Sequence, residues 1–168
     1  MNTVTTAAPT QAEPKLLGQT VVLIGGSAGI GLETARFARA EGADVILTAR
    51  DPDRLQRAAS EVGALSTAAF DATDFDRLAK FFDELPNTID HVLVTGPGPY
   101  YAPLAEFDFE AARRDLEAHI LLPLHVARNA ASKVRPGGTL LFIGGVGGRR
   151  TVKGLTLVSA LTAAKPAR

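Results

Sequence analysis

Three glycines at fixed spacing, Gly25, Gly29 and Gly31, could hold a phosphate group. They follow the apolar run 21–24, which is typical of a strand buried on both faces of a parallel sheet. Residues 32–41, which come next, have helical spacing. Gly25 permits a tight turn, Gly29 has no Cβ to block a pyrophosphate, and Gly31 lets the helix pack close to the strand. Because free N–H groups at a helix N-terminus bind phosphate oxygens, this stretch predicts a dinucleotide site.

The spacing of these glycines is G-x-x-x-G-x-G, which differs from the G-x-G-x-x-G of the commonest dinucleotide fold. The alternative is a strained turn between strand and helix that needs left-handed glycines and binds nothing. Three glycines between a buried strand and a helix favour the dinucleotide site over that alternative.

The residues after the second predicted strand bear on the choice of cofactor. Enzymes that use NAD place a carboxylate at the end of this strand, where it binds the ribose 2′-hydroxyl. Here Ala49 takes that position, and Arg50 follows it with a guanidinium that can bind two phosphate oxygens at once. The alternative is that Arg50 is a solvated loop arginine. We expect NADP(H) in preference to NAD(H).

Strands and helices alternate along the chain. Asp51 is predicted to cap a helix that begins at Pro52, Pro123 to kink a long helix, and the pair Gly137–Gly138 to turn the chain into the last strand. The pattern predicts a Rossmann-like α/β fold, a three-layer, doubly wound parallel sheet of order 3-2-1-4-5 that stops after the fifth strand and one helix. The predicted strands are 21–24, 43–48, 64–70, 91–95 and 139–143, and the further helices are 73–84, 109–133 and 155–164.

The composition indicates one globular domain and excludes several functions. We expect residues 1–15 to form a disordered tail and residues 16–168 to form the domain. The formal net charge is zero, which disfavours a nucleic-acid or membrane partner. The chain has no cysteine and only three histidines without metal spacing, so we expect no metal site. Without a signal peptide or anchor, the protein is predicted to be cytoplasmic.

With these residues in place, residues 16–164 resemble the short-chain dehydrogenase/reductase family. The three glycines match its cofactor motif, although Ile24 stands where the family has threonine, and residues 95–98 keep only Gly98 of its Asn-Asn-Ala-Gly loop. The resemblance implies an adenine contact at Asp71. The cofactor residues expected are Gly25, Ser27, Gly29, Ile30 and Gly31 at the pyrophosphate, Arg50 at the 2′-phosphate, Asp71 and Ala72 at adenine, and Gly96 and Gly98 at the adenosine ribose.

The catalytic residues of that family are missing. Its tyrosine acid/base and the lysine four residues later correspond to Val158 and Thr162, its serine to Gly145, and its helical asparagine to His119. Valine cannot donate a proton, and threonine cannot supply the charge that acidifies a phenol. The family's usual mechanism is therefore absent.

Other residues could replace the missing acid. Tyr100 and Tyr101 follow the fourth predicted strand, and either could protonate an alkoxide if a cation of the segment 149–153 lowered its pKa. The alternative, which we favour, is that both tyrosines pack a loop. His119 could hold a water or act as a base, but a histidine on a long helix is more often structural.

The chain stops where the family continues with a sixth strand and a substrate region. Residues 140–143 would then lie at a sheet edge, which invites pairing. We expect either a truncated form of a longer chain or a homo-oligomer formed through helix 109–133 or the fifth strand. The favoured function is an NADP(H)-binding, oxidoreductase-like protein with weak or atypical catalysis on an unknown carbonyl or alcohol. The alternatives are an inactive nucleotide-binding module, acting as a sensor or partner subunit, and a truncated product without a function.

Overall fold

A five-stranded parallel sheet organises residues 14–144, the part of the chain that this computed structural model describes. Residues 1–13 of the predicted tail 1–15 and the predicted helix 155–164 lie outside these residues; Lys15 is described, and its N–H bonds a Glu41 carboxylate oxygen at 2.9 Å. The strands are β1 Thr20–Ile24, β2 Asp44–Ala49, β3 Ser66–Ala69, β4 Ile89–Val94 and β5 Val134–Phe142. The helices are α1 Gly29–Ala40, α2 Pro52–Val62, α3 Phe75–Glu84, the short 3-10 helix η1 Leu104–Glu106, α4 Phe109–Leu116, the π-helical turn η2 Glu117–Leu121 and α5 Leu122–Ala130.

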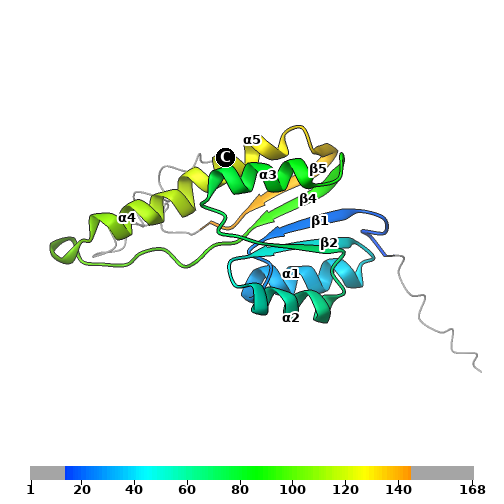
Figure 1. Cartoon of the computed structure of the whole chain (residues 1–168), viewed down its shortest axis with the longest axis horizontal. Helices are drawn as coiled ribbons and strands as arrows, with labels where there is room; N and C mark the ends of the chain where they lie inside the picture. The colour runs from blue at the N-terminus through cyan, green and yellow to red at the C-terminus, as the bar shows by residue number, and fades with distance from the viewer. Residues whose placement is uncertain (1–13, 145–168) are drawn as a thin grey trace, which may run out of the picture.

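The strand order is β3-β2-β1-β4-β5, so the predicted doubly wound fold is confirmed. Helices α1 and α2 cover one face of the sheet, and α3 and α5 cover the other (Figure 1). The register places Leu23 of β1 beside Leu47 of β2 and Leu93 of β4, and all three side chains are buried under α1 and α2. Since the central strands are apolar on both faces, they form two cores, one in each outer layer.

Aspartate caps begin three of the helices. Asp51 accepts a hydrogen bond from the Arg54 N–H at 2.9 Å, with Pro52 in the first turn, as the sequence predicts. The next helix is shorter than predicted, because Asp74 caps it and Phe75 is its first residue. Asp108 caps α4 through the Glu110 and Ala111 N–H groups.

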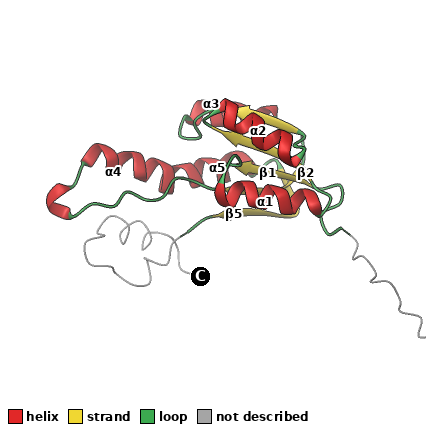
Figure 2. Ribbon diagram, turned by 90° about the horizontal axis from the view of Figure 1, so that it is seen from below, coloured by secondary structure: helices red, strands yellow, loops and turns green. Residues whose placement is uncertain are grey.

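The prediction of one kinked helix over 109–133 is wrong in detail. Between α4 and α5 the backbone widens into the π-helical turn η2, in which the Leu122 N–H bonds the Glu117 carbonyl five residues back. Pro123 follows at once and has no N–H to give, so the i to i−4 ladder cannot continue through it unchanged. The helical segment ends at Ala130. Figure 2 shows α4 reaching beyond the sheet, with the loop that follows β4 beside it.

The predicted turn at Gly137–Gly138 is also wrong. Both glycines lie inside β5, which starts at Val134 and has a bulge between its pairings with Ile89 and His91 of β4. Gly137 has a φ of 85°, and a Cβ on Gly138 would overlap the Asp90 carbonyl. Gly137 therefore supplies the positive φ of the bulge, and Gly138 permits a close strand approach, instead of turning the chain into a new strand.

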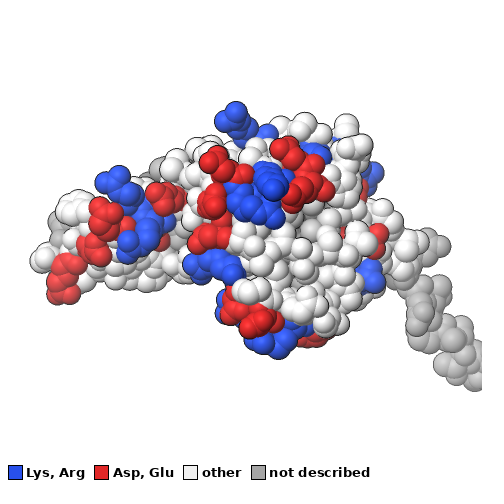
Figure 3. Space-filling view, viewed as in Figure 1, with Lys and Arg blue, Asp and Glu red and all other residues white. Residues whose placement is uncertain are grey.

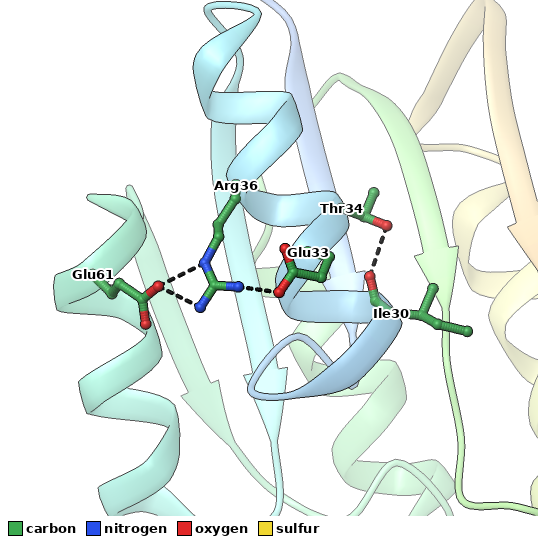
Figure 4. A network of polar contacts seen from close by, with 5 residues as sticks. All are labelled: Ile30, Glu33, Thr34, Arg36 and Glu61. Atoms are coloured by element: carbon green, nitrogen blue, oxygen red, sulfur yellow. Dashed lines mark hydrogen bonds and ion pairs between the residues drawn. The ribbon is translucent and has the colours of Figure 1, made fainter.

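The surface carries mixed charge. On the face drawn in Figure 3, acidic and basic side chains are interspersed. Figure 4 shows Arg36 of α1 turned toward Glu61 of α2, where its Nε lies 2.6 Å from a carboxylate oxygen, while Ile30 and Thr34 lie on the other side of α1. Hydrogen bonds to Glu33 and Glu61 raise the pKa of Arg36.

Within residues 14–144, every helix falls short of the length and apolarity that a bilayer crossing requires.

Candidate functional site

A cavity of about 630 Å³ lies at the carboxyl ends of β1, β2 and β4. This is the sheet edge at which doubly wound folds bind ligands. Its wall combines the turn after β1, the ends of β2 and β3, the loop after β4, and one side of α4 and η2. Segments that are distant in the sequence therefore meet around a single space of the size typical for small-molecule sites.

The glycine turn has the geometry that its residues predict. Gly25 has a φ of 91°, and its N–H bonds the Thr48 carbonyl at 3.0 Å. Thr95 Oγ1 donates to the Gly25 carbonyl at 2.9 Å and so fixes the turn to the end of β4. A Cβ on Gly31 would overlap the Gly25 carbonyl, which confirms that Gly31 allows close packing of helix and strand. Gly29, at a φ of 53°, has open space where a Cβ would stand.

Helix α1 begins without a side-chain cap. Ala28 is in the N-cap position, and the first turn contains no acidic residue. The N–H groups of Gly29, Ile30 and Gly31 precede the first intrahelical hydrogen bond, which Leu32 gives to the Ala28 carbonyl at 3.3 Å. These donors and the positive end of the helix dipole suit an anion. Asp51, Asp74 and Asp108 fill the corresponding position at α2, α3 and α4.

The other end of the cavity is basic. Arg50 and Arg54 line it, beside Ala49 at the end of β2, and neither forms an ion pair within the described residues. Asp71 also lines it and accepts hydrogen bonds from the Thr73 N–H at 3.0 Å and hydroxyl at 2.8 Å. Burial would raise the pKa of Asp71, but these hydrogen bonds and the Arg50 charge hold it below its ordinary value.

Seven of the ten predicted cofactor residues lie around this cavity. They are Gly25, Ser27, Arg50, Asp71, Ala72, Gly96 and Gly98. The remaining three, Gly29, Ile30 and Gly31, form the first turn of α1 and do not line it.

Of the candidate catalytic residues, Tyr100 lines the cavity. Its hydroxyl accepts the Asp108 N–H at 3.0 Å, and its ring packs 5.7 Å from that of Phe107, so it packs the loop as favoured above. The side chain of Tyr101 is mostly exposed. His119 lies behind the loop after β4, with Nε2 3.2 Å from the Pro97 carbonyl oxygen. Gly145, Val158 and Thr162 lie outside the described residues.

Sequence reasoning missed several residues of the cavity wall. Arg54 is in the first turn of α2, four residues after Arg50, so its place at the same sheet edge could have been predicted. Arg114 and Asp115 line the cavity from α4. Asp115 is four residues before His119, and that spacing puts both on one helix face. Thr95 was placed at the end of the fourth predicted strand and at the start of the family's loop motif, but its hydrogen bond to the glycine turn was not predicted.

The fold is that of an α/β protein of the doubly wound class, with a cavity at the carboxyl ends of its strands. More specifically, the chain belongs to the short chain dehydrogenase family, which matches residues 19–167.

Individual relatives agree with this family. The chain is 27% identical to the short-chain dehydrogenase/reductase ATR9 of Stachybotrys chlorohalonatus, over 90% of this chain and 66% of the relative. It is 32% identical to the cyclic-di-GMP-binding biofilm dispersal mediator protein of Escherichia coli, over 85% of this chain and 60% of the relative. The crystal structure of BdcA in complex with NADPH superposes with a TM-score of 0.80 at 30% identity, covering 89% of this chain and 61% of BdcA. The chain thus spans about 60 to 66% of the length of these proteins.

Proposed function

We propose that this chain binds NADP(H) in the cavity and belongs to an oxidoreductase-like protein acting on a carbonyl or alcohol, with weak or atypical catalysis. The observation that carries the proposal is the combination of two anion-binding features at one cavity. Ala28, the N-cap residue of the uncapped helix α1, lines the cavity together with Gly25 and Ser27 of the glycine turn, and Arg50 and Arg54 line it as well. BdcA, which shares the fold, was crystallised with NADPH.

The residues of the cavity fit such a dinucleotide. The N–H groups of the first turn of α1 would bind the pyrophosphate, and the open space at Gly29 leaves room for it. Arg50 and Arg54 would bind the 2′-phosphate, while Ala49 presents no carboxylate to repel it. Asp71 and Ala72 would lie at the adenine, and Gly96 and Gly98 at the adenosine ribose. When bound, the reduced nicotinamide supplies a hydride.

Calorimetric titration of the purified chain with NADPH, and separately with NADH, tests the proposal. Binding of NADPH at least about tenfold tighter than NADH is expected if Arg50 and Arg54 contact the 2′-phosphate. A well-folded chain that binds neither nucleotide would contradict it. Oxidation of NADPH that depends on an added carbonyl compound would then separate an enzyme from a binding module.

The second candidate is a catalytically inactive nucleotide-binding module, a sensor or a partner subunit. It is favoured by a third cavity arginine, Arg114 of α4, which likewise has no ion pair within residues 14–144, and by the E. coli relative's name. Two phosphodiesters of a cyclic dinucleotide would suit arginines from two elements. Titration with cyclic-di-GMP in the presence and absence of NADPH tests it. Competition between cyclic-di-GMP and NADPH that disappears in the variant Arg114→Ala would support the sensor. If cyclic-di-GMP does not bind, this ligand is excluded.

The predicted cytoplasmic location and the predicted homo-oligomer stay predictions.

A further inference from the structure

A buried carboxylate connects the loop after β4 to the helical segment beside it. Asp115 Oδ1 accepts the Tyr100 N–H at 3.0 Å and lies 3.1 Å from His119 Nδ1. The same ring nitrogen is 3.0 Å from the Asp115 carbonyl oxygen, and Nε2 is 3.2 Å from the Pro97 carbonyl oxygen. Two residues of the helical segment thus hold the loop at Pro97 and at Tyr100, and both of these loop residues line the cavity.

The contacts of His119 are complete in one protonation state only. Both of its ring nitrogens face acceptors, a carboxylate and a carbonyl on one side and a carbonyl on the other. A neutral imidazole has one donor and one lone pair, so either tautomer would direct a lone pair at an oxygen. Only the doubly protonated ring donates on both sides.

Asp115 is an unfavourable choice for stability alone. The residue is 7% exposed, and its Oδ2 has no hydrogen-bond partner within the described residues. A buried carboxylate oxygen without a donor costs free energy that an apolar side chain at this position would not. Packing therefore does not explain an aspartate here, whereas its contacts to Tyr100 and His119 do.

We propose that Asp115 and His119 are positioning residues that form a latch on the cavity wall. The latch consists of the Asp115 carboxylate, the His119 ring and their contacts to the loop at Pro97 and Tyr100. It holds the loop in the conformation that faces the ligand, so the affinity of the cavity for its ligand falls when either residue is replaced. The effect of the latch on NADPH affinity rests on the proposed function, whereas its effect on the hydrogen exchange of the loop does not.

The loop that the latch holds carries no charge of its own, since residues 95–103 include two tyrosines and no Lys, Arg, Asp or Glu. The other histidine of the helical segment, His125 of α5, makes a different contact: it stacks on Phe75 at 3.8 Å between ring centroids.

Hydrogen exchange of the loop tests the latch without a ligand. The full chain is compared with His119→Gln and with Asp115→Asn, which keeps the side-chain shape; His125→Gln is the matched control. We expect faster exchange of the Tyr100 amide, by about threefold to tenfold, in both latch variants and not in the control. Unchanged exchange of the Tyr100 amide in both variants would overturn the proposal. An increase in exchange throughout α4 as large as that at Tyr100 would also overturn it, because it would show that the two residues only stabilise the helix.

Titration with NADPH tests the consequence for binding. We expect affinity about threefold to tenfold weaker than wild type in His119→Gln and in Asp115→Asn, and unchanged affinity in His125→Gln. Wild-type affinity in both latch variants would overturn the coupling to binding. If NADPH binds to none of these proteins, the proposed function fails, while the exchange measurement still decides whether the latch exists.

Discussion

At the scale of single residues, two glycines of the turn after β1 lack a side chain for different reasons. Gly31 is required by the fold, because a Cβ would overlap the Gly25 carbonyl. Gly29 adopts a positive φ, which strains any other residue, but a Cβ there would meet no neighbouring atom. A substitution at Gly29 therefore tests the ligand only beside a control that carries the same backbone strain, whereas one at Gly31 tests folding.

Gly29→Val should abolish binding of both NADPH and NADH, because the side chain would occupy the space of the pyrophosphate. Gly63→Val is the matched control, since Gly63 also has a positive φ of 63° and open space but lies at the end of α2, outside the cavity wall. Calorimetry on both variants measures the effect. Unchanged affinity in Gly29→Val would contradict the binding pose.

Arg50→Ala should weaken NADPH by about tenfold to hundredfold and NADH by much less, because charge-assisted hydrogen bonds to the 2′-phosphate are lost. Arg57→Ala, an exposed arginine of α2 outside the cavity wall, supplies the control. Equal losses for the two nucleotides would remove the role of Arg50 at the 2′-phosphate.

Asp71 should contribute a pH-dependent part of the stability. Its folded pKa lies below the ordinary value of 3.8, so its stabilisation is present above that value and is lost as the pH falls through the folded pKa. The difference in free energy of unfolding between wild type and Asp71→Asn should therefore shrink as the pH is lowered from about 5 to about 3. Urea denaturation across this range measures it; a constant difference would mean that ionised Asp71 adds nothing.

At the scale of elements, the sequence predicts what depends on local chemistry. Asp51 and Pro52 mark a helix start by their types alone, and apolar strands indicate a parallel sheet. The π-helical turn before Pro123 and the bulge at Gly137 were missed, because each depends on how a neighbouring element packs. Likewise, the cavity residues next to the glycine motif were predictable, whereas Asp115 matters only because the fold brings Tyr100 to it.

The cap of α3 gives a quantitative prediction for one element. Asp74→Ala should lower the free energy of unfolding by about 0.5–2 kcal/mol, because the Arg77 N–H loses its acceptor at 3.0 Å. Asp76→Ala removes an equal charge from the first turn without removing the cap, so only a few tenths of a kcal/mol are expected. Equal effects of the two changes, by urea denaturation, would show that charge and not capping matters.

At the scale of the whole molecule, exposed apolar side chains lie along both elements proposed for self-association. In the described part of the chain, Leu141 of β5 is 52% exposed beside the buried Leu93 of β4. Along the helical segment, Leu116 is 42% and Leu124 is 63% exposed. Exposed apolar surface is a feature of protein interfaces when it forms a patch. These are the two surfaces through which we expect the chain to self-associate.

Leu141→Lys and Leu124→Lys separate the two surfaces. A buried lysine charge opposes association, so the substitution on the true interface should raise the dissociation constant of the oligomer by about tenfold or more. Sedimentation velocity over a range of concentrations measures it, with each variant serving as the control for the other. A monomeric wild type would contradict the predicted homo-oligomer.

The uncapped N-terminus of α1 has a consequence for the lifetime of the protein. Helices α2 and α3 have an aspartate at the N-cap, whereas α1 has none. If the proposed nucleotide binds there, ligand at a hundred times its dissociation constant adds about 2.7 kcal/mol to stability. The unfolded fraction open to proteases would fall accordingly, so the abundance of the protein would follow the cell's supply of that nucleotide.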